Sequence, residues 1–124
     1  MAVVKAAACV GGSFVVAQLI RALERRYLTV PVCNVSLQVI PLLPDHNSYP
    51  VIDRVISMID ATGVKYVVGP METTMEGELR ELLGIVEKAH AICVEAGANR
   101  IISNVKIDYS TEGVTIESKI GKYR

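Results

Sequence analysis

Val35-Ser-Leu-Gln-Val-Ile40 decides the fold of this chain, because two sets of side chains alternate along it with a period of two. Such alternation is typical of a strand that has one covered face. Pro41 and Pro44 predict the end of the strand, and the polar run Asp45-His-Asn-Ser48 predicts a turn. The segment therefore predicts the first strand of a sheet that is packed on one side.

A helix and two further strands are predicted on the C-terminal side of this turn. Pro50 suits a first helical turn and Gly63 supplies a stop. Between them, apolar residues recur at helical spacing: Val51, Ile52, Val55, Ile56 and Ile59. The β-branched run 64–68 predicts a second strand, which Gly69-Pro70 breaks, and residues 71–75 predict a short third strand.

A second helix and a fourth strand complete the pattern. Thr73 and Glu76 have the spacing of a capping box, in which a hydroxyl and a carboxylate satisfy the free backbone donors at a helix start. The N–H groups near Thr74 would then be open to an anion. Gly97 closes the helix, and residues 100–108 predict the fourth strand. Apolar residues of the helix follow at steps of three and four: Leu79, Leu82, Leu83, Val86, Ala89 and Cys93.

The order β-α-β-β-α-β predicts a ferredoxin-like α/β (α+β) fold, with an antiparallel four-stranded sheet and two helices on one face. Two helices cannot cover both faces, so the other face is left to water, a ligand or another subunit. On that face, the apolar Ile40 and Ile102 lie among Gln38, Asn104 and Lys106. We therefore expect self-association through the open face.

Residues 1–33 differ from the remainder and are expected to form an N-terminal extension of uncertain structure, with the domain proper at 34–124. The extension has a net charge of +3 and the remainder has −3. The apolar run 6–20 is short for a membrane span, which needs roughly 20 residues, and no clear signal-peptide cleavage site follows it. A peripheral strand or helix is favoured, and the extension is expected to be dispensable for folding.

A sharper interpretation of the extension is the start of a dinucleotide-binding unit, with a strand over 3–10 and a helix over 14–26. The fingerprint fails, because Gly11 and Gly12 are adjacent and no third glycine follows in the helix. No acidic residue ends a second strand about 20 residues further on. We therefore expect no cofactor.

Composition excludes several classes of partner. Basic and acidic side chains balance at 13 each, so no overall field attracts nucleic acid or a membrane. Trp is absent and there is a single Phe, which argues against base-stacking platforms. The three cysteines are widely spaced without a CxxC, as expected for reduced, packed thiols in the cytoplasm.

Three stretches resemble the signatures of the thiamine-binding protein family: 34–41, 68–77 and 100–108. The run Gly-Pro-Met-x-Thr-Thr-x-Glu-Gly over 69–77 is the most specific, and the resemblance covers about residues 34–122. It implies a ferredoxin-like subunit that assembles into homodimers and then homotetramers. It also implies a pocket at a subunit interface for thiamine or its hydroxymethylpyrimidine half.

An aminopyrimidine needs hydrogen-bonding groups along one edge and a wall for its flat face. Met71, Met75 or Tyr66 could form the wall, and thiazolium would favour Glu72 or Glu76 as a neighbour. Other roles stay open, namely a helix cap for Thr73 and Glu76, a subunit contact for the strand amides, and an ion pair between Lys106 and Asp108. The candidate ligand-binding residues are Ser36, Gln38, Thr73, Thr74, Glu76 and Asn104.

No enzyme constellation emerges from the sequence. His46 lies in a proline-rich turn, and His90 lies beside apolar helix positions, which is typical of a structural histidine. HExxH, a paired Cys/His cluster and a P-loop are all missing, so no catalytic residue or metal site is expected. The expected function is a carrier or sensor. The alternatives are a structural or regulatory oligomeric module whose pocket binds sulfate or phosphate, and a weak enzyme acting on a pyrimidine.

Overall fold

The computed structural model describes residues 13–28 and 30–124. They belong to two compact units, Met1–Val30 and Pro31–Arg124. In the first unit, α2 runs from Phe14–Leu28, so this part of the extension is a helix. The strand considered over 3–10 lies outside the described residues. None of the helices in the described part is long and apolar enough to cross a membrane.

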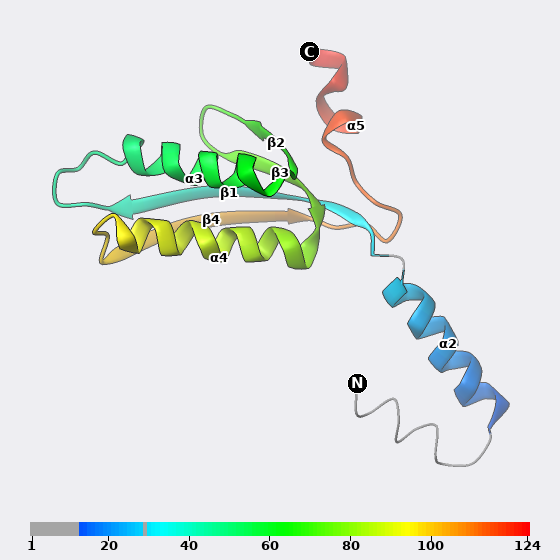
Figure 1. The fold of residues 1–124 in the computed structure, drawn as a ribbon. Coiled ribbons are helices and arrows are strands. Elements are labelled where there is room, and N and C mark those ends of the chain that lie inside the picture. The colour runs from blue at the N-terminus through cyan, green and yellow to red at the C-terminus, as the bar shows by residue number, and fades with distance from the viewer. Residues whose placement is uncertain (1–12, 29) are drawn as a thin grey trace. The chain divides into compact units, whose positions relative to one another are not determined.

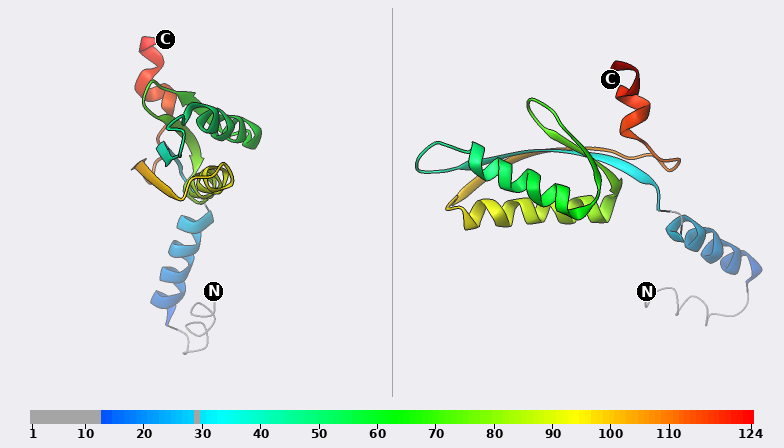
Figure 2. Two further views of the ribbon diagram at one scale, coloured as in Figure 1. Left: turned by 90° about the vertical axis from the view of Figure 1, so that its left-hand side faces the viewer. Right: turned by 45° about the horizontal axis from the view of Figure 1, so that its top comes forward.

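The second unit is a two-layer α+β domain (Figure 1). Its sheet has the strand order β2-β3-β1-β4, with every neighbouring pair antiparallel. Figure 2 shows α3 and α4 side by side against one face of this sheet, which confirms the predicted fold class. The elements are β1 (Val32–Leu42), α3 (Tyr49–Thr62), β2 (Lys65–Val68), β3 (Thr73–Glu78), α4 (Leu79–Glu95), β4 (Arg100–Asp108), α5 (Ile116–Ile120) and a 3-10 turn (Gly121–Tyr123).

The core lies between the helices and the sheet, and it follows the predicted periodicities. Residues 33–37 of β1 are all buried, alternate residues are buried further along the strand, and one stripe of each helix is buried. Gly63 ends α3 in the left-handed region with φ 80°. The buried apolar side chains include Cys33, Val35, Leu37, Val39, Val51, Val55, Ile59, Met75, Leu82, Ile85, Ala89 and Cys93.

The first strand extends beyond its predicted ends. It begins at Val32, and Cys33 is completely buried, so the last residues of the predicted extension contribute to the domain. At its other end, Pro41 pairs with Ile101 of β4 instead of stopping the strand. Pairing with β3 ends at Leu37, and a proline is tolerated where one edge of a strand is free.

The predicted capping box is wrong. Thr73 and Glu76 are strand residues of β3, and α4 begins at Leu79 with Glu78 as an N-cap that makes no side-chain cap bond. Thr74 therefore lies in mid-strand, and the anion site expected at a helix start near it is wrong as well. Pairing with β1 on one side and β2 on the other satisfies this backbone, which overrides the local helix signal.

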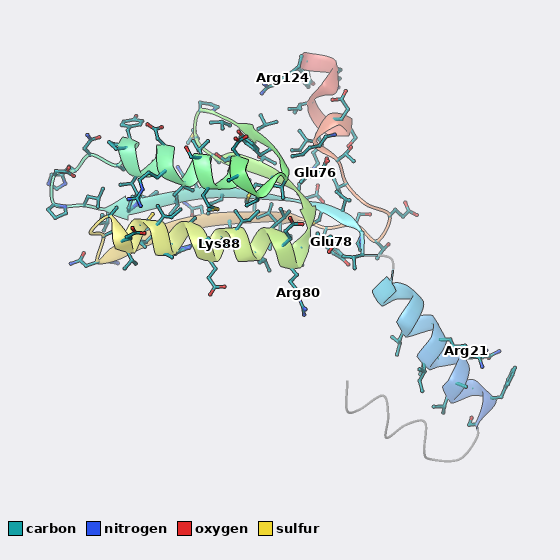
Figure 3. All side chains as sticks on the ribbon, in the orientation of Figure 1. Arg21, Glu76, Glu78, Arg80, Lys88 and Arg124 are labelled. Carbon is teal, nitrogen blue, oxygen red and sulfur yellow. The ribbon has the colours of Figure 1, made fainter. Side chains whose placement is uncertain are left out.

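The C-terminal segment binds to one end of the open sheet face. The Val114 N–H donates to the Val32 carbonyl at 2.8 Å, and the Ile116 N–H donates to Glu76 Oε1 at 2.7 Å. Figure 3 labels Glu76 beside the start of this segment. Asn34 Nδ2 adds a bond of 3.4 Å to the Val114 carbonyl. The open face is thus partly covered by the chain itself.

Candidate functional site

The turn between β2 and β3 is the structural centre of the candidate site. The Gly69 N–H donates to the Glu72 carbonyl at 2.8 Å, which closes the turn tightly. A Cβ at position 69 would lie 3.0 Å from that carbonyl oxygen, so a larger residue there would force the turn to shift. Residues 69–72 line two cavities, one on each side of the turn.

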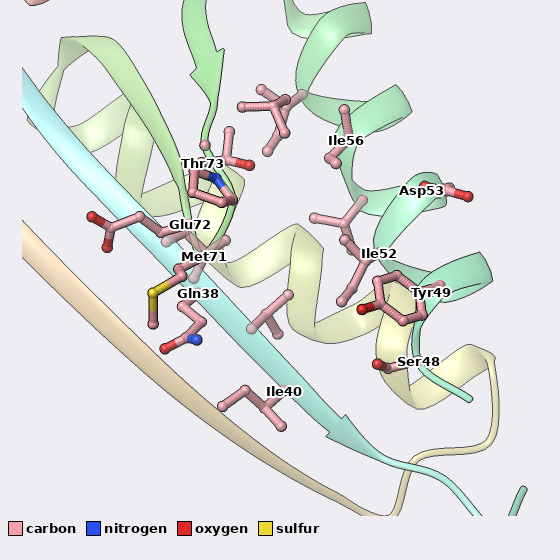
Figure 4. Close-up of a pocket in the computed structure, with 17 residues that line it drawn as sticks. Gln38, Ile40, Ser48, Tyr49, Ile52, Asp53, Ile56, Met71, Glu72 and Thr73 are labelled. Carbon is pink, nitrogen blue, oxygen red and sulfur yellow. The ribbon is translucent and has the colours of Figure 1, made fainter. Parts of the chain in front are cut away.

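The first cavity, of about 440 Å³, lies between α3, the turn and the edge of β1 (Figure 4). It exists because β1 pairs with β4 as far as Leu42, whereas its pairing with β3 stops at Leu37. The backbone of residues 38–42 therefore has no strand partner on this side. Ile52 and Ile56 of α3 supply apolar lining opposite this edge.

Polar groups are few in the first cavity, and several lie at its margin. Figure 4 shows Tyr49 turned toward the cavity and Asp53 turned away from it. Glu72 and Gln38 lie on the side of β1 that faces β4. Thr73, which is 8% exposed, faces the helices and lines the cavity from β3. No lysine or arginine is among the lining residues, all of which are described.

The second cavity, of about 460 Å³, lies on the open face beneath the C-terminal segment. Thr74 and Asn34 line it from the sheet, and Lys119 and Arg124 line it from the segment. Asn34 is 3% exposed, and its Oδ1 is the buried side-chain acceptor without a partner among the described residues. The two cavities thus differ in charge, since basic groups reach only the second one.

Four of the six predicted site residues come together on the open face. Ser36 pairs in register with Thr74, and Gln38 pairs with Asn104. Asn104 Nδ2 donates to Gln38 Oε1 at 3.0 Å. Whether these groups hold a ligand stays a prediction.

The other two predicted site residues lie apart from this group. Thr73 points to the helix side of the sheet, because successive strand residues alternate faces. Glu76 accepts the bond from the Ile116 N–H and lies 3.9 Å from Lys65 Nζ. Its carboxylate is thus engaged within the chain.

The predicted wall of the pocket is only partly where it was expected. Met71 lines both cavities. Met75 is completely buried in the core, and Tyr66 donates to Asp60 Oδ1 at 2.9 Å, so neither lines a cavity of the turn. This bond to a carboxylate raises the pKa of Tyr66. Sequence reasoning missed Tyr49, Ile52 and Ile56, whose helical spacing assigns them to a helix but does not reveal the missing neighbour of β1.

Lys106 and Asp108 do not pair with each other. Lys106 donates to Glu72 at 2.8 Å, and Asp108 binds Lys119 at 2.6 Å. Both strand residues point to the open face, where the turn and the C-terminal segment offer closer partners than a neighbour two residues along the same strand.

The remaining reactive side chains have structural surroundings. Cys33 and Cys93 are free and completely buried, and burial raises the pKa of both thiols. Cys9 lies outside the described residues. His90 bonds to the Val86 carbonyl at 2.7 Å and to Ser103 Oγ at 2.8 Å, as expected for a structural histidine. The described part of the chain holds no group of three or more His, Cys, Asp or Glu suited to a metal ion.

Residues 35–124 match the family model described as thiamine-binding protein. The chain is 59% identical over 92 residues to a UPF0045 protein of Clostridium perfringens, a match that covers 74% of this chain and 97% of that protein. It is 32% identical over 71 residues to a UPF0045 protein of Bacillus subtilis, covering 56% of this chain and 68% of that protein.

Two solved structures are similar over most of this chain. A domain of unknown function from Bacillus cereus is 43% identical, with a TM-score of 0.71, and the match covers 76% of this chain and 91% of that one. A candidate thiamine biosynthesis/salvage protein of Thermotoga maritima is 41% identical, with a TM-score of 0.69, and the match covers 76% of this chain and 100% of that one.

Proposed function

We propose that this chain, which belongs to the thiamine-binding protein family, binds thiamine or its hydroxymethylpyrimidine half as a carrier or sensor, without catalysis. The observation that carries the proposal is the first cavity, of about 440 Å³, beside the turn 69–72. Pockets for small molecules commonly measure about 300–1,000 Å³ and combine apolar walls with a few polar groups. The turn belongs to the stretch of sequence that most specifically resembles the family.

The cavity suits the pyrimidine ring. Ile52 and Ile56 offer apolar surface to its flat face, and the Thr73 hydroxyl can bond to its polar edge. The free edge of β1 over residues 38–42 adds unpaired backbone donors and acceptors. A polar heterocycle binds well where its own donors and acceptors and those of the protein pair with each other, and poorly where either set is left unpaired.

The thiazolium of thiamine carries a positive charge, and the mouth of the cavity favours one. Glu72 lies there, whereas lysine and arginine are missing from the residues that line this cavity. Glu72 is paired with Lys106. A bound thiazolium would compete with that ammonium group for the same carboxylate.

We further infer that a second subunit covers the open face and completes the mouth of the cavity, as a homodimer or homotetramer. Ile40 and Ile102 pair in register there and are 37% and 45% exposed. Exposed apolar surface of this kind is typical of an interface. Light scattering at micromolar concentration should give a mass of two or four chains, and a stable monomer would contradict an interface pocket.

A matched pair of variants tests the site. Thr73→Val and Thr74→Val each remove one hydroxyl at constant shape, on opposite faces of β3. Thr73→Val should weaken the binding of thiamine and of hydroxymethylpyrimidine alike by roughly 5- to 150-fold, since a lost buried hydrogen bond costs about 1–3 kcal/mol. Calorimetry measures both affinities. Thr74→Val should change neither affinity. If only Thr74→Val weakens binding, the ligand lies in the second cavity. If both variants keep the parental affinity, neither hydroxyl binds the ligand and the proposed site is wrong.

One observation favours the alternative of an anion-binding module. Lys119 and Arg124 both line the second cavity. If this is the functional site, the parent should bind sulfate but not thiamine. Arg124→Gln should then weaken sulfate binding, and Thr73→Val should leave it unchanged.

A further inference from the structure

The helix α2 has two chemically different sides. At 100° per residue, the spacing places Val16, Leu19 and Leu23 on one side. It places Arg21 on the opposite side. Figure 3 labels Arg21 on this helix. The model of the thiamine-binding protein family begins after this helix, at residue 35, so the proposed ligand site leaves α2 without a role.

The apolar side chains of α2 are strongly exposed. Val15 is 69% exposed, Leu19 59% and Leu23 49%. Clusters of exposed apolar side chains mark interaction surfaces. A helix of about 15 residues is also marginal in water on its own, because its nucleation is costly. Both features call for something that covers the apolar side.

The net charge of residues 1–33 indicates which kind of surface covers the apolar side of α2. Residues 1–33 carry a net charge of +3, although the chain as a whole is neutral. We propose that α2 lies on the surface of an anionic phospholipid membrane, with its apolar side among the acyl chains and Arg21 at the headgroups. The balanced charge of the whole chain argued against a membrane partner, and it conceals this local excess.

Two other arrangements fit the helix less well. A coiled coil with a second copy needs three or four heptads, whereas Phe14–Leu28 provides about two. A transmembrane arrangement fails on length, because 15 residues rise about 22 Å and the hydrocarbon core measures about 30 Å. A helix in the plane of the interface has neither difficulty.

Vesicle flotation of the full chain tests the proposal. Vesicles of phosphatidylcholine and phosphatidylglycerol in equal parts should carry the protein upward. Binding should be at least tenfold weaker to pure phosphatidylcholine, and also weaker in about 0.5 M salt, because screening reduces the attraction. Arg21→Gln should weaken binding about fivefold, since one arginine near the surface contributes about that factor.

A charge-neutral pair of double variants isolates the apolar side. Leu19→Asn/Leu23→Asn should abolish flotation, whereas Ala17→Asn/Gln18→Asn, which places the same amides away from that side, should float like the parent. Failure of the parent to float with anionic vesicles would overturn the proposal. Equal loss in both double variants would also overturn it. Concentration-dependent self-association without lipid that only the leucine variant abolishes would assign α2 to a second copy instead.

Discussion

Lys106 Nζ donates to Glu72 Oε1 at 2.8 Å and so joins β4 to the turn between β2 and β3. Lys106 pairs in register with Ser36, so its side chain crosses β1 on the open face to reach the turn. The two side chains are 72% and 32% exposed, and exposed pairs of this kind contribute little stability. The main effect of the pair is to neutralise the carboxylate at the mouth of the first cavity.

Lys106→Gln should therefore raise the affinity for thiamine about two- to fivefold, because it frees Glu72 for the thiazolium. The affinity for uncharged hydroxymethylpyrimidine should stay the same. Calorimetry with both ligands measures the difference. Lys65→Gln is the matched control, since Lys65 lies near Glu76 and outside the first cavity.

The converse variant supplies the contradicting outcome. Glu72→Gln should lower thiamine affinity by a similar factor and leave hydroxymethylpyrimidine binding unchanged. If either variant shifts both ligands equally, Glu72 acts through the shape of the turn and not through its charge.

Gly69→Ala should lower the affinity for both thiamine and hydroxymethylpyrimidine, because the added Cβ would lie 3.0 Å from the Glu72 carbonyl oxygen and push the turn open. Gly84→Ala is the control, since a Cβ there meets nothing within 4 Å. In the middle of α4 it should stabilise the fold by about 0.5–1 kcal/mol and leave affinity unchanged. Calorimetry and thermal melting separate the two effects. Parental affinity in Gly69→Ala would show that the turn does not shape the pocket.

Deletion of residues 1–30 should leave a domain that unfolds cooperatively with unchanged free energy, since the compact unit is Pro31–Arg124. Deletion of residues 1–33 should cost about 1–3 kcal/mol. It removes the buried Cys33 and the Val32 carbonyl that accepts from the Val114 N–H. Urea denaturation of both truncated proteins checks the difference. Equal stability would show that the start of β1 adds nothing to the domain.

Stability should fall as the pH rises above about 9. The pKa values of Cys33 and Cys93 are raised above the ordinary thiol value of 9.0, mainly by burial. Above that value the unfolded chain ionises its thiols while the folded chain keeps them protonated, so the unfolded state is stabilised and the free energy of unfolding falls. Urea denaturation at about pH 8 and pH 10 should show a smaller loss for Cys33→Ala/Cys93→Ala than for the parent. Equal losses would contradict this cause.

Most of the fold follows from local patterns. The alternation over residues 35–40 predicted the covered face of β1, and the interval from Pro50 to Gly63 predicted α3. The fourth strand has the bounds that the sequence predicts, at Arg100–Asp108. Periodicity succeeds here because each element buries one side against the same core, so one pattern reports both the element and its buried face.

The site was less accessible to sequence reasoning, and its parts show why. Thr73 and Glu76 have the spacing of a helix cap, but pairing between distant strands made them a strand. The first cavity depends on where β3 stops along β1, opposite Leu37. The partner of Lys106 is Glu72, which lies far from it in the chain.

The sequence by itself determined the order of the strands and helices, the covered face of the sheet and the family, because these depend on the type and spacing of neighbouring residues. Only the tertiary structure decided which side chains meet at the turn 69–72 and which edge of β1 is left free. Those relationships arise from strand register, which is set by contacts between residues that are distant in the chain and leaves no local periodic trace.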